Sequence, residues 1–328
     1  MAFAGAQCPS LHYSAGYNIG LLGLEKLHPF DANRSRRALR VLGERIGRRA
    51  LSRHLTPVTR EAREDDLILV HSAAYLASVS QSRTIAQVLE VAAVERLPDW
   101  LSNRWLGRPM RLAVQGTIEA ARSALKTGLA VNLAGGFHHA SHDRGGGFCM
   151  YSDAIIAVRA LQRDQLLGNS IGVLYIDLDA HQGNGVARAC AQLDMTEVYI
   201  FDMYCRDIYP GDDVAADRID LAVPLQMGTG DHFYLEALRQ LLPRAITQSR
   251  ASLAIYNAGT DVLAGDPLGG LNVSGNGVME RDRYVIESCR AAGIPLLVLP
   301  SGGYTHTSHK LIAAMLVHAV ERYATAKI

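Results

Sequence analysis

The sequence is poor in several features that mark other classes of protein. Its five cysteines are widely spaced and form no C-x-x-C pair, so neither a disulfide framework nor a zinc finger is indicated. Reduced thiols in a cytoplasmic protein are therefore expected. The formal net charge is +1, and no long run of Lys or Arg predicts intrinsic nucleic-acid binding. No apolar stretch approaches the ~20 residues of a spanning helix and no secretory leader pattern is present, so we expect no membrane span.

What the sequence does contain is an ordinary globular composition, with 48% hydrophobic and 20% charged residues. From residue 111 onward, short apolar runs alternate with amphipathic segments, which predicts βα units and a largely parallel sheet. No linker or break in composition divides this pattern, so we expect one α/β domain over residues 1–328. Strands are predicted at 130–133, 171–177, 198–202, 252–257 and 295–299, and helices at 116–129, 152–163, 186–193, 231–246, 281–292 and 308–323.

The chain before residue 111 is less regular. A helical pattern runs over 31–49, with Asp31 as the expected N-cap, and a second helical pattern runs over 73–80. Residues 81–110 contain both tryptophans and two X-Pro steps. We predict an irregular excursion there, which is either an insertion that shapes a cleft or a plain surface loop.

One stretch, GVLYIDLDAHQGNG at 172–185, runs from an apolar strand into a polar turn. It carries Asp177, Asp179 and His181 at i, i+2 and i+4, a spacing that points all three side chains to one side of an extended chain. Two carboxylates and an imidazole suit a divalent metal. A single Asp here would be explained equally well as a helix cap, but two adjacent carboxylates would repel each other without a cation.

Three further polar motifs follow predicted strands, where sites in open α/β sheets are found. His138 and His139 offer groups for proton transfer, Asp261 can complete a metal triad, and Tyr304 places a hydroxyl on a glycine turn. Each motif alone is a weak signal, because an adjacent His pair is more often structural than catalytic. Their combination in this order is far more specific than any one of them.

With these motifs the sequence resembles the zinc-dependent histone deacetylase family of the arginase/deacetylase fold, and most closely its class IV branch. The resemblance extends over nearly the whole chain and implies a single α/β domain around a central, mostly parallel eight-stranded sheet. It rests on YNIG and GLEKLHPFDA near the start, GGFHHASHDRGGGFC, IDLDAHQGNG, IYPGD, YNAGTDVLAGDPLGGL and SGGY.

The resemblance implies a metal site with an Asp₂His ligand set. Asp179, His181 and Asp261 match the family's zinc ligands, and three protein ligands leave a position for water and the substrate carbonyl. Asp177 matches the partner of the first histidine, His138. The region of Asp177 also resembles a potassium site, so a structural K⁺ is expected near it.

The resemblance also implies catalytic roles. His139 matches the general base, His138 its electrostatic partner, and Tyr304 the phenol that hydrogen-bonds the polarised carbonyl and the oxyanion. Asn184 stands where other branches carry the Asp that orients the second histidine. A neutral amide can orient His139 but cannot stabilise its cation as a carboxylate would.

Four residues match the lining of the family's acyl-lysine tunnel. Phe148 and Tyr209 correspond to its aromatic walls, Leu268 falls near its floor, and the Gly147 carbonyl corresponds to an acceptor for the substrate amide. Core packing is the alternative role for each of them. The three glycines at 145–147 lack side chains and are expected to leave room near the zinc.

The leading hypothesis is a zinc-dependent hydrolase that removes acetyl or longer fatty acyl groups from lysine ε-amines of a protein or peptide. A small acylated amine such as an acetylpolyamine is the alternative substrate. A pseudoenzyme that only binds acyl-lysine is disfavoured because every catalytic group is present. An arginase-like manganese hydrolase is disfavoured because Gly183 stands where a second metal cluster needs an Asp. The sequence predicts no oligomeric state.

Overall fold

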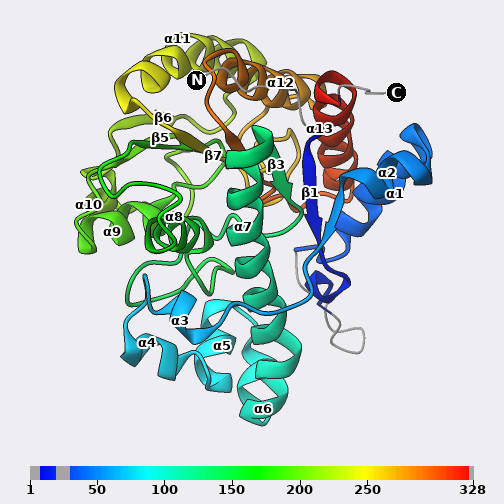
Figure 1. Ribbon diagram of the computed structural model, residues 1–328. Helices are drawn as coiled ribbons and strands as arrows, with labels where there is room; N and C mark the ends of the chain where they lie inside the picture. Colours follow the sequence, from blue (N-terminus) through cyan, green and yellow to red (C-terminus); the bar gives the residue numbers. More distant parts are fainter. Residues whose placement is uncertain (1–7, 20–29, 325–328) are drawn as a thin grey trace.

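The apolar runs predicted as strands form the middle of a central sheet, because a parallel sheet has helices on both faces and needs strands buried on both sides. The computed structural model describes residues 8–19 and 30–324 (Figure 1). Within these residues eight strands pair in the order β2-β1-β3-β8-β7-β4-β5-β6, and all neighbours are parallel. The predicted single α/β domain around a mostly parallel eight-stranded sheet is confirmed. The strands are β1 Ser10–Tyr13, β2 Leu55–Pro57, β3 Leu129–Asn132, β4 Val173–Asp177, β5 Val198–Cys205, β6 Leu221–Leu225, β7 Leu253–Asn257 and β8 Leu296–Leu299.

Helices cover both faces of the sheet and produce two apolar cores. On one face α7, α8 and α9 pack, and on the other α1, α11, α12 and α13 (Figure 1). Alternate side chains of β4 divide between the cores: Val173 and Tyr175 join the first, Leu174 and Ile176 the second. The helices are α1 Arg34–Ile46, α2 Arg48–His54, α3 Glu64–Leu67, α4 Ala73–Ser78, α5 Ser82–Val88, α6 Asp99–Ser102, α7 Arg108–Thr127, α8 Asp153–Arg163, α9 Asn184–Gln192, α10 Asp213–Ala216, α11 Asp231–Ser249, α12 Gly275–Ala291 and α13 Ser308–Tyr323, with shorter turns at Ala15–Tyr17, Ala92–Arg96 and Asn103–Gly107.

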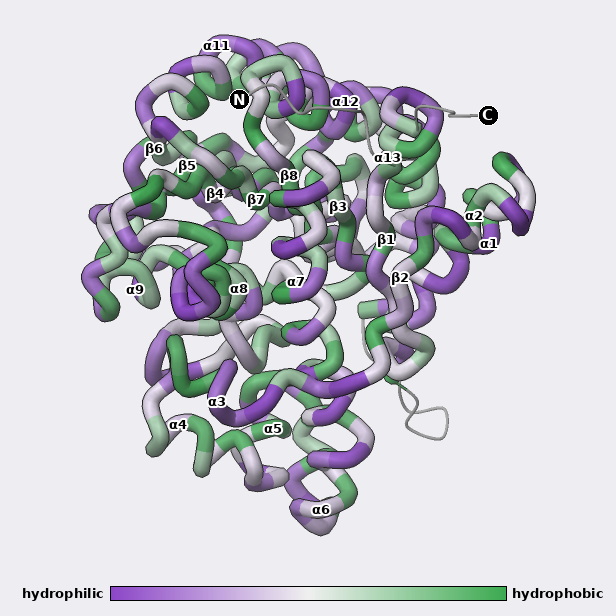
Figure 2. Tube along the Cα trace, viewed as in Figure 1, coloured by the Kyte–Doolittle hydropathy of each residue, from purple (hydrophilic) through white to green (hydrophobic). Residues whose placement is uncertain are grey.

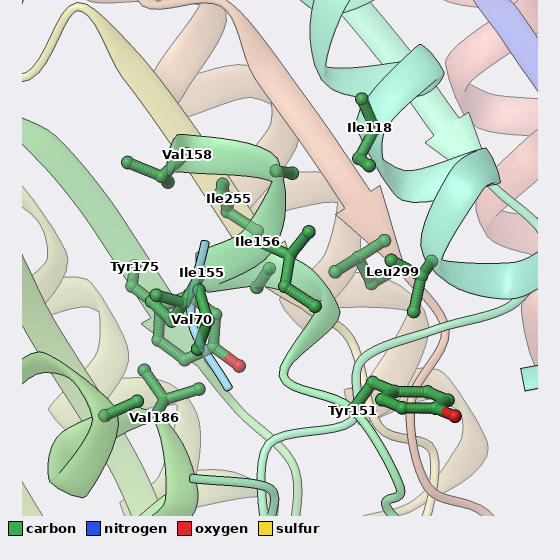
Figure 3. Packing of buried hydrophobic residues seen from close by; sticks show 14 of the residues in the cluster. Val70, Ile118, Tyr151, Ile155, Ile156, Val158, Tyr175, Val186, Ile255 and Leu299 are labelled. Atoms are coloured by element: carbon green, nitrogen blue, oxygen red, sulfur yellow. The ribbon is translucent and has the colours of Figure 1, made fainter. Parts of the chain in front are cut away.

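The first core shows how tightly the helices are fixed to the sheet. Ile155 and Val158 of α8 lie near Tyr175 of β4 and Ile255 of β7, and all four side chains are buried (Figure 3). Each such apolar side chain stabilises the fold by roughly 1.5–3 kcal/mol relative to an exposed one. The outer helices carry hydrophobic and hydrophilic residues in alternation, as α11 does in Figure 2, so only one side of each faces the sheet. None of the described helices is both long and apolar enough to span a membrane.

The prediction for residues 81–110 was wrong, because this segment is mostly helical. It contains α5, the turns at Ala92–Arg96 and Asn103–Gly107, α6 and the start of α7. Pro109 is the second residue of α7 and directly follows the π-helical turn at Asn103–Gly107, where the helix already departs from regular α geometry. Ile85 and Leu106 join the first core, so burial of apolar side chains decides the structure where the two X-Pro steps suggested a loop.

Other differences lie near the N-terminus. The first helix begins at Arg34 and not at Asp31, whose carboxylate instead accepts a hydrogen bond from the Asn33 N–H at 2.9 Å. The expected Asp31 N-cap is therefore wrong. The helix that was predicted to begin at residue 116 is α7, and it begins at Arg108. The motif at 17–20 extends beyond the described residues, and most of the motif at 23–32 lies outside them.

Candidate active site

The predicted site residues lie in loops that follow four adjacent strands, β3, β8, β7 and β4. Because the strands are parallel, their carboxyl ends share one edge of the sheet, and the loops meet there. The loop residues are His138 and His139 after β3, Asp177 at the end of β4 with Asp179 and His181 beyond it, Asp261 after β7, and Tyr304 after β8.

Asp179, His181 and Asp261 form a buried cluster that could hold a metal ion. One potential ligand atom from each lies within 4.8 Å of the other two. His181 Nδ1 is 3.1 Å from Asp179 Oδ1 and 3.3 Å from Asp261 Oδ2. Asp261 Oδ2 is buried and has no hydrogen-bond partner among the described residues. A cation between these three residues would satisfy that oxygen, so the donor set fits a metal.

The pKa values of this cluster also indicate that it needs a positive charge. Burial disfavours charge on His181, but the carboxylates of Asp179 and Asp261 close to its Nδ1 outweigh it and raise the pKa of His181 to about 11. Burial and then the charge of Asp179 raise the pKa of Asp261 to about 7. Protons therefore occupy the cluster when no cation does, because closely spaced buried carboxylates need a positive charge between them.

The surrounding backbone holds the two carboxylates in place. Asp179 Oδ2 accepts hydrogen bonds from Ser301 Oγ at 2.9 Å and from the Gly302 N–H at 2.8 Å. Asp261 Oδ1 accepts one from the Ala180 N–H at 2.8 Å. A Cβ at Gly302 would clash with both carboxylates, so glycine is required at that point of the turn after β8.

Asp177 does not join this cluster, contrary to what its spacing from Asp179 and His181 predicted. The chain leaves the extended conformation at the end of β4 and turns, with the Asp179 N–H donating to Asp177 Oδ1 at 3.2 Å. Asp177 Oδ2 instead lies 2.9 Å from His138 Nδ1, and Asn257 Nδ2 donates to Oδ1 at 2.9 Å. The Asp177 carboxylate therefore orients His138.

The two adjacent histidines differ in their partners and in their charge. His139 Nδ1 lies 2.8 Å from Asn184 Oδ1, and the rings of His138 and His139 are 4.1 Å apart. Burial opposes charge on His138, but Asp177 and Asp179 outweigh it and raise the pKa of His138 to about 9. Burial and then the charges of His138 and His181 lower the pKa of His139 well below its usual value. In the metal-free protein one ring is cationic and its neighbour neutral.

Tyr304 faces the cluster from the turn after β8. Its ring makes edge contacts with Phe148 at 6.1 Å and with His181 at 6.2 Å between centroids. Its backbone N–H donates to Asp266 Oδ2 at 2.8 Å. Burial and then the charges of Asp261 and Asp179 raise the pKa of the phenol well above its usual value, so it stays protonated and can donate a hydrogen bond.

The four predicted lining residues lie around the histidines and Tyr304 to different degrees. The Tyr209 ring is 5.0 Å from His139 and 49% exposed. Leu268 is 37% exposed, and its backbone N–H donates to Asp266 Oδ1 at 3.0 Å, so its place in the tunnel stays a prediction. Gly147 has φ 50° and a Cβ there would clash with the His139 ring, so this glycine permits a close approach to the imidazole.

Two of the three glycines at 145–147 do not leave the open space that the sequence suggested. A Cβ at Gly145 would lie 2.5 Å from both the Tyr75 hydroxyl and the Cys149 carbonyl oxygen, and one at Gly147 would lie 2.4 Å from the His139 ring. At Gly146 a Cβ would meet only the Tyr209 hydroxyl, at 3.2 Å, so the expected room is limited to that position.

Three residues of the site were missed in the sequence. Asp202 of β5 is fully buried beside Asp177, with Oδ1 unpartnered among the described residues, and a charged residue in an apolar run was its only signal. Arg34 is buried and donates to the carbonyl oxygens of Ser301, Gly302 and Gly303, which fixes the turn before Tyr304. Asp212 contacts Asn184, and nothing local in the sequence indicates that contact.

The fold and site define an α/β domain of the arginase/deacetylase type with a buried site that fits a metal ion. The model of the histone deacetylase domain family matches residues 28–320. The chain belongs to this family. Histone deacetylase 2 of Arabidopsis thaliana is 41% identical over 305 residues, which cover 93% of this chain and 76% of that protein.

The chain is also similar to two further proteins. An uncharacterised protein of Picosynechococcus sp. is 40% identical over 200 residues, which cover 61% of this chain and 64% of that protein. The crystal structure of the HDA15 HD domain has the same fold, with a TM-score of 0.72 and 22% identity over 97% of this chain and 91% of that one. Family membership supports hydrolytic deacetylation as the chemistry of this chain.

Proposed function

We propose that this chain is a zinc-dependent lysine deacylase of the class IV type. The observation that carries the proposal is the buried cluster of Asp179, His181 and Asp261 directly beside His139 and Tyr304. Two carboxylates and one imidazole, without a thiolate, form a three-ligand set of the kind that catalytic zinc uses. When bound, zinc would polarise the acyl carbonyl and lower the pKa of a water molecule to near neutrality.

His139 is the proposed general base. Its Nδ1 is occupied by the Asn184 side chain, which leaves Nε2 to accept the proton of the attacking water. The low pKa of His139 keeps the ring neutral before the reaction, as a base must be. The same nitrogen then returns a proton to the leaving lysine amine.

His138 and Tyr304 influence the charges of the neighbouring groups during the proposed reaction. His138, held by Asp177, supplies a positive charge beside His139 and keeps that ring from ionising early. The protonated phenol of Tyr304 donates a hydrogen bond to the substrate oxygen as negative charge develops there, which is the oxyanion-stabilising role.

A second cation, potassium, is proposed beside Asp177 and Asp202. Both carboxylates are fully buried, and burial followed by the charge of Asp177 raises the pKa of Asp202 well above its usual value. A monovalent cation, or else a proton on Asp202, would offset this density of charge.

The proposed substrate is the acylated side chain of a lysine in a protein or peptide, entering past Phe148 and Tyr209. An acylated polyamine is the second candidate. The observation in its favour is the exposed residue Glu90, which lies near Tyr209 at the outer part of the site: burial raises the pKa of Tyr209, and the charges of Cys149 and Glu90 add to this effect. A carboxylate there would attract a cationic amine.

The decisive experiment measures turnover of acyl-lysine peptides and acetylated polyamines with and without a chelator. We expect chelator-sensitive hydrolysis, near-stoichiometric zinc in the purified protein, and loss of both in Asp261→Ala. The matched control Asp217→Ala removes an exposed carboxylate and should keep both. Full zinc occupancy in Asp261→Ala would contradict the ligand assignment. Chelator-resistant turnover would contradict zinc dependence.

A further inference from the structure

The Asn184 side chain lies between His139 and a carboxylate from a distant loop. Asn184 Oδ1 is 2.8 Å from His139 Nδ1, and Asn184 Nδ2 donates to Asp212 Oδ2 at 3.2 Å. Asn184 begins α9, whereas Asp212 precedes α10 in the segment that also carries Tyr209. The Asn184 amide thus connects His139 to Asp212, which lies 28 positions beyond Asn184 in the chain.

The chemistry of these groups sets the direction of the amide. An ionised carboxylate can only accept hydrogen bonds, so the Asn184 atom that faces Asp212 must be the NH₂ group. The atom that faces His139 is then the carbonyl oxygen, which also can only accept. His139 must therefore carry its hydrogen on Nδ1, and Nε2 keeps its lone pair. The opposite orientation of the amide would favour a hydrogen on Nε2 and would remove the base.

Asp212 is held firmly enough to impose this direction. Arg188 donates to both of its oxygens, at 2.6 Å and 2.7 Å, and the Ala215 N–H donates at 3.0 Å. With Asn184, the carboxylate receives four hydrogen bonds, which fill its acceptor positions. The backbone of Asp212 also pairs with the Gln182 side chain through two hydrogen bonds of 3.2 Å.

We propose that Asp212 is a positioning residue, which fixes the tautomer of His139 by orienting the Asn184 amide. This inference rests on the proposed role of His139 as the general base. A carboxylate at position 184 would need no such help, because both of its oxygens accept hydrogen bonds. An amide has one donor end and one acceptor end, so an amide requires a third residue that distinguishes them.

The test replaces Asp212 by Ser, which can still cap the Ala215 N–H but offers no carboxylate to Asn184. Histidine-selective ¹⁵N NMR of the purified protein reads the tautomer, and the His139→Ala spectrum assigns the signal among the 12 histidines. We expect a single Nδ1–H form in the wild type and a mixture with the Nε2–H form in Asp212→Ser. The kcat should fall about twofold at unchanged KM, since a hydrogen bond to a charged group biases the amide by at least about tenfold and its loss leaves the two forms about equally populated.

Rescue separates this role from a structural one. In Asn184→Asp/Asp212→Ser the carboxylate at 184 again faces Nδ1–H, so the single tautomer and most of the kcat should return. The control Asp164→Ser removes a carboxylate paired with Arg163 at the far end of α8, and should change neither. An unchanged tautomer in Asp212→Ser, or a lost kcat that the double variant does not restore, would overturn the inference. A wild-type protein without turnover would refute the proposed function instead, while the NMR signal still reports on the tautomer.

Discussion

Loading zinc into the metal-free protein should release protons, and the number released should rise as the pH falls. Without a cation, the carboxylate oxygens of Asp179 and Asp261 beside Nδ1 outweigh burial and hold a proton on His181, whose pKa is about 11. To bind a metal, that nitrogen must lose the proton. Burial and the charge of Asp179 place a second proton on Asp261, whose pKa is about 7. Metal and protons therefore compete for the same three side chains.

The magnitude follows from these two values. His181 should contribute about one proton through the neutral range, whereas Asp261 should contribute a growing part of a second proton as the pH falls through its pKa of about 7. The cluster should therefore release about one proton in alkaline buffer and should approach two in mildly acidic buffer. Because both pKa values are raised, protons compete less with the metal as the pH rises, and zinc affinity should increase with pH through this range.

Calorimetric titration of zinc into chelator-treated protein, in buffers of different ionisation enthalpy, measures the protons released. His138, with a pKa of about 9, could add a further proton if the bound cation repels it. The same titration in His138→Gln separates that contribution. Stoichiometric zinc binding with release of less than about half a proton at pH 8 would refute the argument that a proton replaces the metal on His181.

Three other predictions concern catalysis. His139→Ala and Tyr304→Phe should keep the metal, measured by metal analysis, and should lose about 10²–10⁴-fold and about 10²–10³-fold in kcat; wild-type kcat in either would exclude its role. Because the pKa of His139 lies well below its usual value, the base should work in mildly acidic buffer. Relative to Asp212→Ser, adding Asn184→Asp should raise that pKa and move the acidic limb of kcat/KM upward in pH, and an unmoved limb would show that another group controls it. Octanoyl- to myristoyl-lysine peptides should give higher kcat/KM than the matched acetyl peptide, as expected of the class IV branch; a faster acetyl substrate would contradict this.

The sequence predicted the central strands well and the outer strands poorly. β4 and β7 are buried on both faces, so their apolar runs are continuous and easily recognised. β2 and β6 lie at the two edges of the sheet, and β2 has only three residues. β6 alternates in exposure and contains Pro224, which an edge strand tolerates because one side of it has no partner. Edge strands are therefore held by their neighbours more than by local preference.

A similar division applies to the site. Residues in motifs, such as His139 and Asp261, could be found because strand ends in a parallel sheet meet at one edge. The role of Arg34 could not, because Arg34 acts through hydrogen bonds to a turn that is distant in the sequence. Asp212 lies in the IYPGD motif, but its contact with Asn184 depends on how two distant loops meet. The periodicity of a strand also failed at Asp177, since the chain turns there and sends its carboxylate to His138. The spacing of residues in the sequence predicts which way their side chains point only while the backbone keeps a regular strand or helix conformation.

The buried charges explain why cations belong to this fold. Asp177, Asp179, Asp202 and Asp261 are all fully or almost fully buried at one edge of the sheet. In the metal-free protein, protons on His138 and His181 and the raised pKa values of Asp202 and Asp261 reduce that negative charge. A divalent ion would take over this role and free His181 to act as a ligand. The same buried carboxylates that attract protons would therefore attract a divalent metal ion.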